Sequence, residues 1–375
     1  MQQDPSPQVM HQYNEAIGLL NGALASQKTS KDDSTLLATI VLSALELKAA
    51  PQLTLDDYFN HIQGACALLE LRGPQQVLSQ LGSALYNQVS SQVFLSCIFG
   101  CHKLPQQLWL LREQIAPYVM NAALTCWREQ GVVMRFVDFR FAAEIALGQD
   151  VMATTDAFRI VTEALHIYVD LCSVFEDAPQ MWQFRLVRGT DQAEVETEHR
   201  FQLYIAAQSW AAFRVISIKI FDIVARIVRR CDNQKDLLES ITNDQRLYVT
   251  NAHHITRQAG LALLASAPQQ VDYLRSRLAN RKPELSLAPE SFERTQIFHC
   301  DNFVHGSLEV DQELPYVIFP AGINIFQAMF LAANTDSVES DLKQQLTSAL
   351  TLIADNTGIR QASQLARILT VTPVT

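Results

Sequence analysis

The stretch HIQGACALLELRGPQQ, residues 61–76, predicts a helix that ends at a Gly-Pro corner and is followed at once by another. From just before this stretch, apolar side chains recur at the spacing of one helix face, at Phe59, Ile62, Cys66 and Leu69. Arg72 falls in the last turn, where a cation complements the helix dipole. Gly73 can adopt the left-handed conformation that ends a helix, and Pro74 is favoured at the start of the next one. The stretch is a packing signature of two helices and a tight corner.

Helical periodicity continues over most of the chain, and no long stretch alternates apolar and polar residues as a half-buried strand does. The predicted helices span residues 8–26, 34–49, 55–71, 74–101, 105–128, 131–147, 151–175, 191–231, 236–265, 268–281, 316–334, 336–356 and 359–370. The sequence therefore predicts an all-α fold, an irregular multi-helix domain of paired antiparallel helices around a central long helix.

The length of 375 residues suits a single helical domain, 1–375, although it would also hold two average domains. Residues 281–315 form the longest section without periodicity, and a loop of that length in a compact domain is often functional. The most apolar window, 317–333, is short for a membrane span and contains Pro320, Asn324 and Gln327. We expect a buried core helix there and no membrane partner.

The chain is acidic, with a formal net charge of −10 and a pI near 5.4. Proteins with a large nucleic-acid footprint normally present a basic face, so we expect no direct contact with nucleic acid. An acidic surface suits a protein partner or a homodimer. The start of the chain shows no basic segment followed by an apolar one, so we expect a protein of the nucleus or cytoplasm.

Seven cysteines are scattered through the sequence, and only Cys97 and Cys101 lie close together. A structural zinc site needs about four ligands at short spacing, so these residues predict reduced, buried thiols. The sequence contains no Gly-rich phosphate loop, no Gly-x-Ser-x-Gly elbow and no His-Glu-x-x-His pattern, and we expect no cofactor. An enzyme would need a site assembled from distant helices, so enzymatic activity stays an open question, with a non-enzymatic function favoured.

The corner and its flanks resemble the fungal-specific regulatory domain that follows the zinc cluster of fungal transcription factors. The resemblance covers about residues 10–112, and its motif positions are His61, Gly64, Leu68, Leu69, Arg72, Gly73, Pro74, Gly82 and Pro105. It implies a helical regulatory-type domain. Members of the family normally begin with six cysteines that hold two zinc ions, and the cysteines of this chain do not follow that pattern. The expectation is therefore a regulatory fold without its own DNA-binding module.

Three groups of residues could carry chemistry. His299, Asp301 and His305 are a weak candidate for a metal site, and the simpler reading is an ordinary polar loop, so we expect no metal. Glu198 and His199, with Glu194, fall at the start of the predicted long helix, where acids complement the dipole. Basic residues interleave with apolar ones over 213–230, which is typical of a long helix with a solvated stripe and also of a surface that contacts phosphates.

Four tryptophans could line an apolar cavity between helices, or simply fill the core: Trp109, Trp127, Trp182 and Trp210. A cavity of this kind would bind a small-molecule effector and shift the domain between two packings. The leading interpretation is thus a transcription-regulator-like protein that acts through protein partners or a small-molecule effector. The alternatives are an enzyme or accessory protein of a fungal biosynthetic pathway that uses the cavity, and a partner that titrates full-length regulators by dimerisation.

Overall fold

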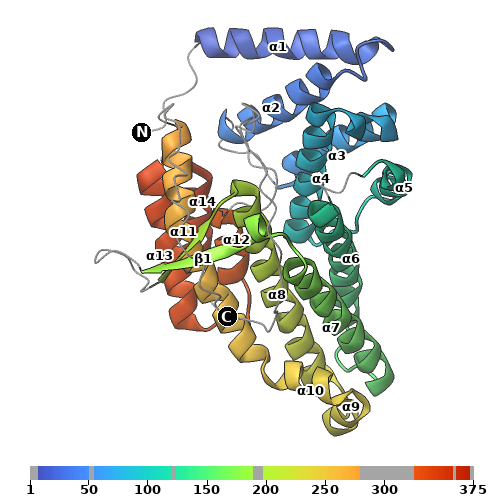
Figure 1. Cartoon of the computed structure of the whole chain (residues 1–375), viewed down its shortest axis with the longest axis vertical. Coiled ribbons are helices and arrows are strands. Elements are labelled where there is room, and N and C mark those ends of the chain that lie inside the picture. The colour runs from blue at the N-terminus through green and yellow to red at the C-terminus, as the bar shows by residue number, and fades with distance from the viewer. Residues whose placement is uncertain are drawn as a thin grey trace. The chain divides into compact units, whose positions relative to one another are not determined.

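The computed structural model confirms the all-α fold (Figure 1). It describes residues 7–49, 55–119, 124–188, 197–278, 325–357 and 360–371. The chain divides into two compact units, Met1–Leu124 and Thr125–Thr375. Among the described residues no helix is long and apolar enough to cross a membrane.

The first unit consists of helices joined by short connections. They are α1 (Pro7–Ala25), α2 (Asp33–Ala49), α3 (Leu55–Arg72), the 3₁₀ helix η1 (Pro74–Leu78), α4 (Gln80–Gly100), α5 (Gln106–Ile115) and the 3₁₀ helix η2 (Ala116–Tyr118). The helix α3 packs on α4, and α2 packs against both. Side chains at helical spacing fill this core, and Ile62, Ala65 and Leu69 of α3 are among those buried.

The second unit is larger. It contains α6 (Leu124–Leu147), α7 (Thr154–Glu176), the 3₁₀ helix η4 (Gln180–Trp182), β1 (Phe184–Arg188), β2 (Thr197–Phe201), α8 (Tyr204–Arg230), α9 (Gln234–Ser240), α10 (Asn243–Thr250), α11 (Ala252–Leu278), α12 (Ile325–Ala333), α13 (Ser340–Thr357) and α14 (Arg360–Val371). The long helix α8 is central: α7 packs on one side of it, and α11 and α12 pack on the other (Figure 1).

Burial explains why α8 is central. Residues 206–209 and 211–218 of this helix are all buried, so its middle has no solvent face. A helix that is buried all round needs neighbours on every side. The helix α7 is more ordinary, because its buried residues recur every three or four positions, from Ala157 to Phe175. The described part of the apolar window, α12, is a buried core helix as predicted.

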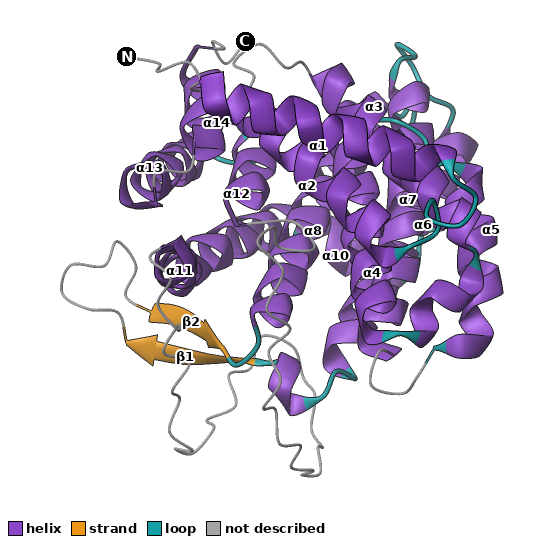
Figure 2. Cartoon of the chain, turned by 90° about the horizontal axis from the view of Figure 1, so that it is seen from above, coloured by secondary structure: helices purple, strands orange, loops and turns teal. Residues whose placement is uncertain are grey.

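The prediction of one helix over 191–231 is wrong at its beginning. Residues 197–201 form β2, which pairs antiparallel with β1 so that Phe184 faces Phe201 and Leu186 faces His199. The hairpin lies beside α11 (Figure 2), and the Gln269 side chain of α11 donates to the Phe201 carbonyl at 2.7 Å and accepts from its N–H at 2.6 Å. Contacts with a distant helix therefore hold β2 in place.

Several predicted helix ends also differ from the structure. Ser79 has extended backbone and splits the predicted helix 74–101, because its hydroxyl caps α4 by accepting from the Gly82 N–H at 2.9 Å. The predicted helix 105–128 ends in the structure at Ile115, where η2 follows with Pro117 in its first turn. Gly131 does not interrupt α6, since glycine inside a helix costs only about 1 kcal/mol.

The predicted helices 236–265 and 268–281 are divided differently. A capping box begins α10: the Thr242 hydroxyl accepts from the Gln245 N–H, and the Gln245 side chain accepts from the Thr242 N–H. The helix α11 continues through Pro268, although an internal proline typically costs about 3 kcal/mol. Packing of α11 on α8, β2, α12 and α13 offsets that cost.

Candidate functional site

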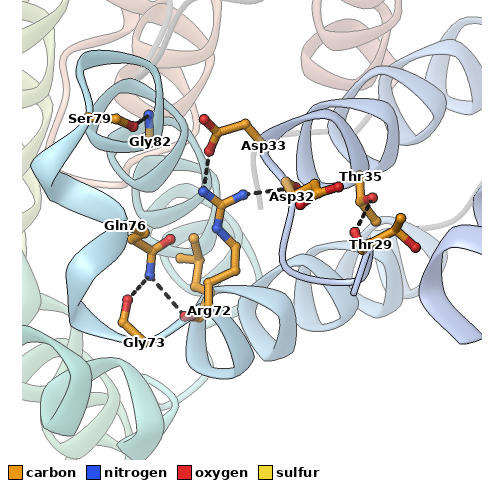
Figure 3. Close-up of polar contacts among 10 residues, drawn as sticks. Thr29, Asp32, Asp33, Thr35, Arg72, Gly73, Gln76, Ser79 and Gly82 are labelled. Atoms are coloured by element: carbon orange, nitrogen blue, oxygen red, sulfur yellow. Dashed lines mark hydrogen bonds and ion pairs between the residues drawn. The ribbon is translucent and has the colours of Figure 1, made fainter. Parts of the chain in front are cut away.

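Arg72 connects the end of α3 to the beginning of α2 (Figure 3). Its guanidinium donates to the main-chain oxygen of Asp32 at 3.1 Å and forms an ion pair with Asp33. The Arg72 side chain is only 5% exposed, so water competes weakly for these bonds. The Thr35 hydroxyl donates to the Thr29 carbonyl at 2.7 Å and holds the connection that leads into α2. Arg72 thus supplies the polar link between these two helices.

Gly73 and Gln76 close the corner. Gly73 has a positive φ, as predicted, but its φ of 74° and ψ of −174° lie in the extended glycine region instead of the left-handed helical one. The Gln76 side chain donates to the carbonyls of Leu69 and Gly73 at 2.9 and 2.8 Å, and so satisfies oxygens at the end of α3 (Figure 3). Pro74 opens η1 at its first position.

The remaining motif positions differ in their surroundings in the first unit. Gly82 packs tightly on η1, and a Cβ at this position would lie 2.0 Å from the Gln76 carbonyl oxygen. Leu68 and Leu69 are buried in the core, whereas Gly64 is exposed. Pro105 lies at the N-cap of α5. The side chain of His61 lies outside the described residues.

The candidate metal ligands His299, Asp301 and His305 all lie outside the described residues, as does Glu194. Within the described part of the chain, no three His, Cys, Asp or Glu residues come close enough to hold a metal ion. Glu198 and His199 lie on β2 and are buried, so the prediction that they begin a long helix is wrong. Glu198 forms an ion pair with Arg200 of the same strand.

The structure brings two of the four tryptophans together. Trp182 is buried and Trp210 is partly buried in one apolar cluster with Phe184, Phe201 and neighbouring small residues. The Trp210 indole donates to the Trp182 carbonyl at 2.8 Å. Trp127 is partly buried on α6. Trp109 is partly buried on α5, in the first unit, so the four residues do not line one cavity within a single unit.

Arg214 is a buried cation in the middle of the second unit. It lies on α8, is 2% exposed, and donates to the Ser266 hydroxyl of α11 and to Nδ1 of His199 at 2.7 Å. The acceptor role of Nδ1 places the His199 proton on Nε2. Among the described residues no carboxylate lies within ion-pair distance of Arg214. This position contradicts the prediction of a fully solvated basic stripe on the helix.

Burial sets the electrostatics of this pair. It lowers the pKa of Arg214 to about 9, which still leaves the guanidinium charged at neutral pH. Burial, and then the nearby Arg214 charge, lower the pKa of His199 to about 2. The imidazole is therefore neutral, and the site carries one positive charge.

Aromatic rings enclose the Arg214 charge. The guanidinium carbon lies 5.4 Å from the Phe184 ring centre, 5.9 Å from that of Phe201 and 5.6 Å from that of Trp210. Each distance is within the range of a cation–π contact. The Phe184 ring also stacks on the His199 imidazole at 4.2 Å. One sequence signal for this site was available: Arg214 stands inside an apolar run of α8, at a spacing where a core residue is expected.

A second buried titratable group connects α6 to α8. Burial raises the pKa of the Glu129 carboxyl to about 7, while a hydrogen bond from the Ser209 hydroxyl at 2.7 Å lowers it. The described cysteines are free, but the prediction of buried thiols holds only for Cys66, Cys97 and Cys231, because the other three are partly exposed. Burial raises the pKa of Cys66 to about 11 and that of Cys126 and Cys172 to about 12, so these thiols are protonated and weakly nucleophilic at neutral pH.

Comparison with known proteins gives one short similarity. A protein of Emericella nidulans described as uncharacterized is 36% identical to this chain over 76 residues, which is 20% of this chain. The aligned part is 15% of the length of that relative. No protein-family model matches the chain. No solved structure matches it either.

Proposed function

We propose that the chain is a fungal transcription-regulator-like protein that acts through protein partners or a small-molecule effector, without a DNA-binding zinc cluster of its own. The observation that carries this proposal is the corner between α3 and α4. Four of its residues, Arg72, Gly73, Gln76 and Gly82, each have a distinct geometric task there, and the tasks depend on one another.

The dependence can be followed residue by residue. Arg72 ties α3 to α2, and Gly73 turns the chain immediately after it. Gln76 then returns to the end of α3, and Gly82 allows α4 to start against η1. A resemblance that rested on composition alone would not place Gly73 at a positive φ and Gly82 at a close backbone approach. The geometry therefore supports the resemblance to the fungal regulatory domain, and with it the proposed function.

A tethering experiment tests the proposal. The full chain is fused to an unrelated DNA-binding domain in a fungal host that carries the matching reporter. We expect reporter output to differ several-fold from that of the DNA-binding domain alone, because a regulatory domain recruits partners wherever it is bound. Gly64→Ala is the matched control for Gly82→Ala. The fusion with alanine at the exposed Gly64 should keep the change in reporter output, and the fusion with alanine at the close-packed Gly82 should lose it. Unchanged output from the intact fusion, at equal protein level, would contradict the proposal.

A further inference from the structure

We propose that Arg214 and His199 form, with α11, an internal site for the carboxylate of a small organic anion. The site lies between β2, α8 and α11 of the second unit. The identification of this anion as an effector rests on the proposed function, whereas the binding itself does not.

The first argument is the unbalanced charge of Arg214. Buried charges in proteins are normally paired, because an unpaired ion loses its hydration without compensation. Arg214 has only a hydroxyl and a neutral imidazole as hydrogen-bond partners among the described residues. A guanidinium carries N–H donors on all three nitrogens, so two partners leave donors over. A bound carboxylate would supply both the missing charge and the missing acceptors.

The second argument is an independent polar group on α11. Gln270 is 1% exposed, and neither its amide nitrogen nor its amide oxygen has a partner among the described residues. It follows Ser266 by one helical turn, so both residues lie on the same face of α11. Ser266 accepts from Arg214, which places this face against the guanidinium. The proposed site takes the amide N–H of Gln270, on this face, as a further donor to an anion at Arg214.

The third argument concerns the kind of anion. His199 is neutral, so the site offers a single positive charge. A carboxylate balances that charge, whereas a phosphate ester carries nearly two negative charges at neutral pH and would leave one buried and unpaired. The rings of Phe184, Phe201 and Trp210 around the guanidinium favour a planar apolar body on the anion. Phe184 and Trp210 are only partly buried, so the core does not wholly cover this aromatic wall.

Calorimetric titration of the full chain tests the site, with benzoate and hexanoate as probes and benzamide as the uncharged analogue of benzoate. We expect saturable binding of at least one carboxylate, weaker binding of inorganic phosphate and no binding of benzamide. Arg214→Met should abolish carboxylate binding, whereas Arg229→Met, an exposed position on the same helix, should leave it unchanged. Absence of binding by both carboxylates at millimolar concentration, or equal binding of benzoate and benzamide, would overturn the proposal.

Gln270→Met keeps the test decisive if Arg214→Met does not fold. Methionine has a similar volume and removes the amide without removing a charge. We expect carboxylate affinity to fall about tenfold or more, as for the loss of a hydrogen bond to a charged group. Unchanged carboxylate affinity in this variant would show that the Gln270 amide does not bind the anion, and would overturn the site as assigned. Because these titrations use no reporter, a failure here is separate from a failure of the tethering experiment.

Discussion

Gly82 lies so close to Gln76 that a Cβ on Gly82 would stand 2.0 Å from the Gln76 main-chain oxygen. The Ser79 hydroxyl oxygen would be 2.8 Å from the same Cβ. The first contact is with backbone, which cannot rotate away as a flexible side chain does. The approach exists because η1 and α4 meet at Ser79, whose hydroxyl caps the new helix. Any side chain at Gly82 therefore has to move η1 away from α4.

Gly82→Ala should lower the free energy of unfolding of the first unit by about 1–3 kcal/mol, the usual cost of overpacking. Gly64→Ala is the matched control, because Gly64 is exposed inside α3 and a Cβ there meets no atom within 4 Å. Alanine at that position should stabilise the helix by about 0.5–1 kcal/mol. Urea denaturation followed by circular dichroism measures both. Equal shifts for the two variants would show that the close approach has no energetic weight.

Gly73→Ala should also destabilise the first unit, by about 1–3 kcal/mol, for a different reason. No atom lies within 4 Å of a Cβ at Gly73, so the loss of stability comes from the strained backbone conformation and not from a clash with a neighbour. The φ of 74° with extended ψ is strained for any residue with a side chain. Gly18→Ala, in the exposed face of α1, is the control and should be neutral or stabilising. A gain in stability for Gly73→Ala in the same urea experiment would contradict the assigned conformation.

The corner was predictable from sequence because its determinants are local. Helical spacing in α3, a glycine and a proline are enough to specify where the chain turns. The hairpin was not predictable in the same way. Its strands have five residues each and carry Arg, Glu and His, and β2 depends on Gln269, which is distant in the sequence. The break before α10 did have a local signal, the capping pair Thr242 and Gln245, which helical periodicity alone overlooks.

The buried cluster shows a second limit of sequence reasoning. A basic residue in an amphipathic pattern is normally solvated, so the core spacing of Arg214 is a weak signal by itself. The packing of α8 against α11 and β2 is what buries this side chain. His199 seemed to belong to a helix start, and its contact with Arg214 requires β2. The pairing of Arg214 with His199 depends on a contact between different elements, for which one sequence carries no spacing rule.

Glu129 should make the second unit less stable as the pH rises. Its folded pKa of about 7 exceeds the ordinary value of 4.5, so the folded state binds more protons than the unfolded state between these values. The free energy of unfolding therefore falls across that window, by roughly 3 kcal/mol, and is flat above it. Glu129→Gln should remove this decrease and gain stability at neutral pH, as measured by urea midpoints at several pH values.

Ser209→Ala is the companion to that experiment. The Ser209 hydroxyl stabilises the charged form of Glu129, so its loss raises the pKa of the carboxyl further. The decrease in stability should then extend to higher pH than in the parent protein. An unchanged pH profile in both variants would mean that Glu129 is solvated in solution.

His199 should have the opposite effect. Its folded pKa of about 2 lies below the ordinary value of 6.5, so between these values the unfolded state binds more protons. The free energy of unfolding therefore rises with pH up to about 6.5, with a slope of up to about 1.4 kcal/mol per pH unit for one proton. Glu129 acts in the reverse direction from 4.5 to about 7, so the two slopes offset one another where they overlap.

The Glu129→Gln background separates these contributions. In that variant the free energy of unfolding of the second unit should rise steadily from pH 4.5 to 6.5, because Glu129 no longer titrates and the contribution of His199 remains. Adding His199→Asn should flatten the climb, since asparagine does not titrate and its side-chain oxygen can still accept from Arg214. Tryptophan fluorescence during urea unfolding measures the stability mainly of the second unit, which contains Trp127, Trp182 and Trp210. If the free energy of unfolding still rises with pH in the double variant, other groups cause the rise. The neutral His199 beside Arg214 would then not explain the loss of stability in acid.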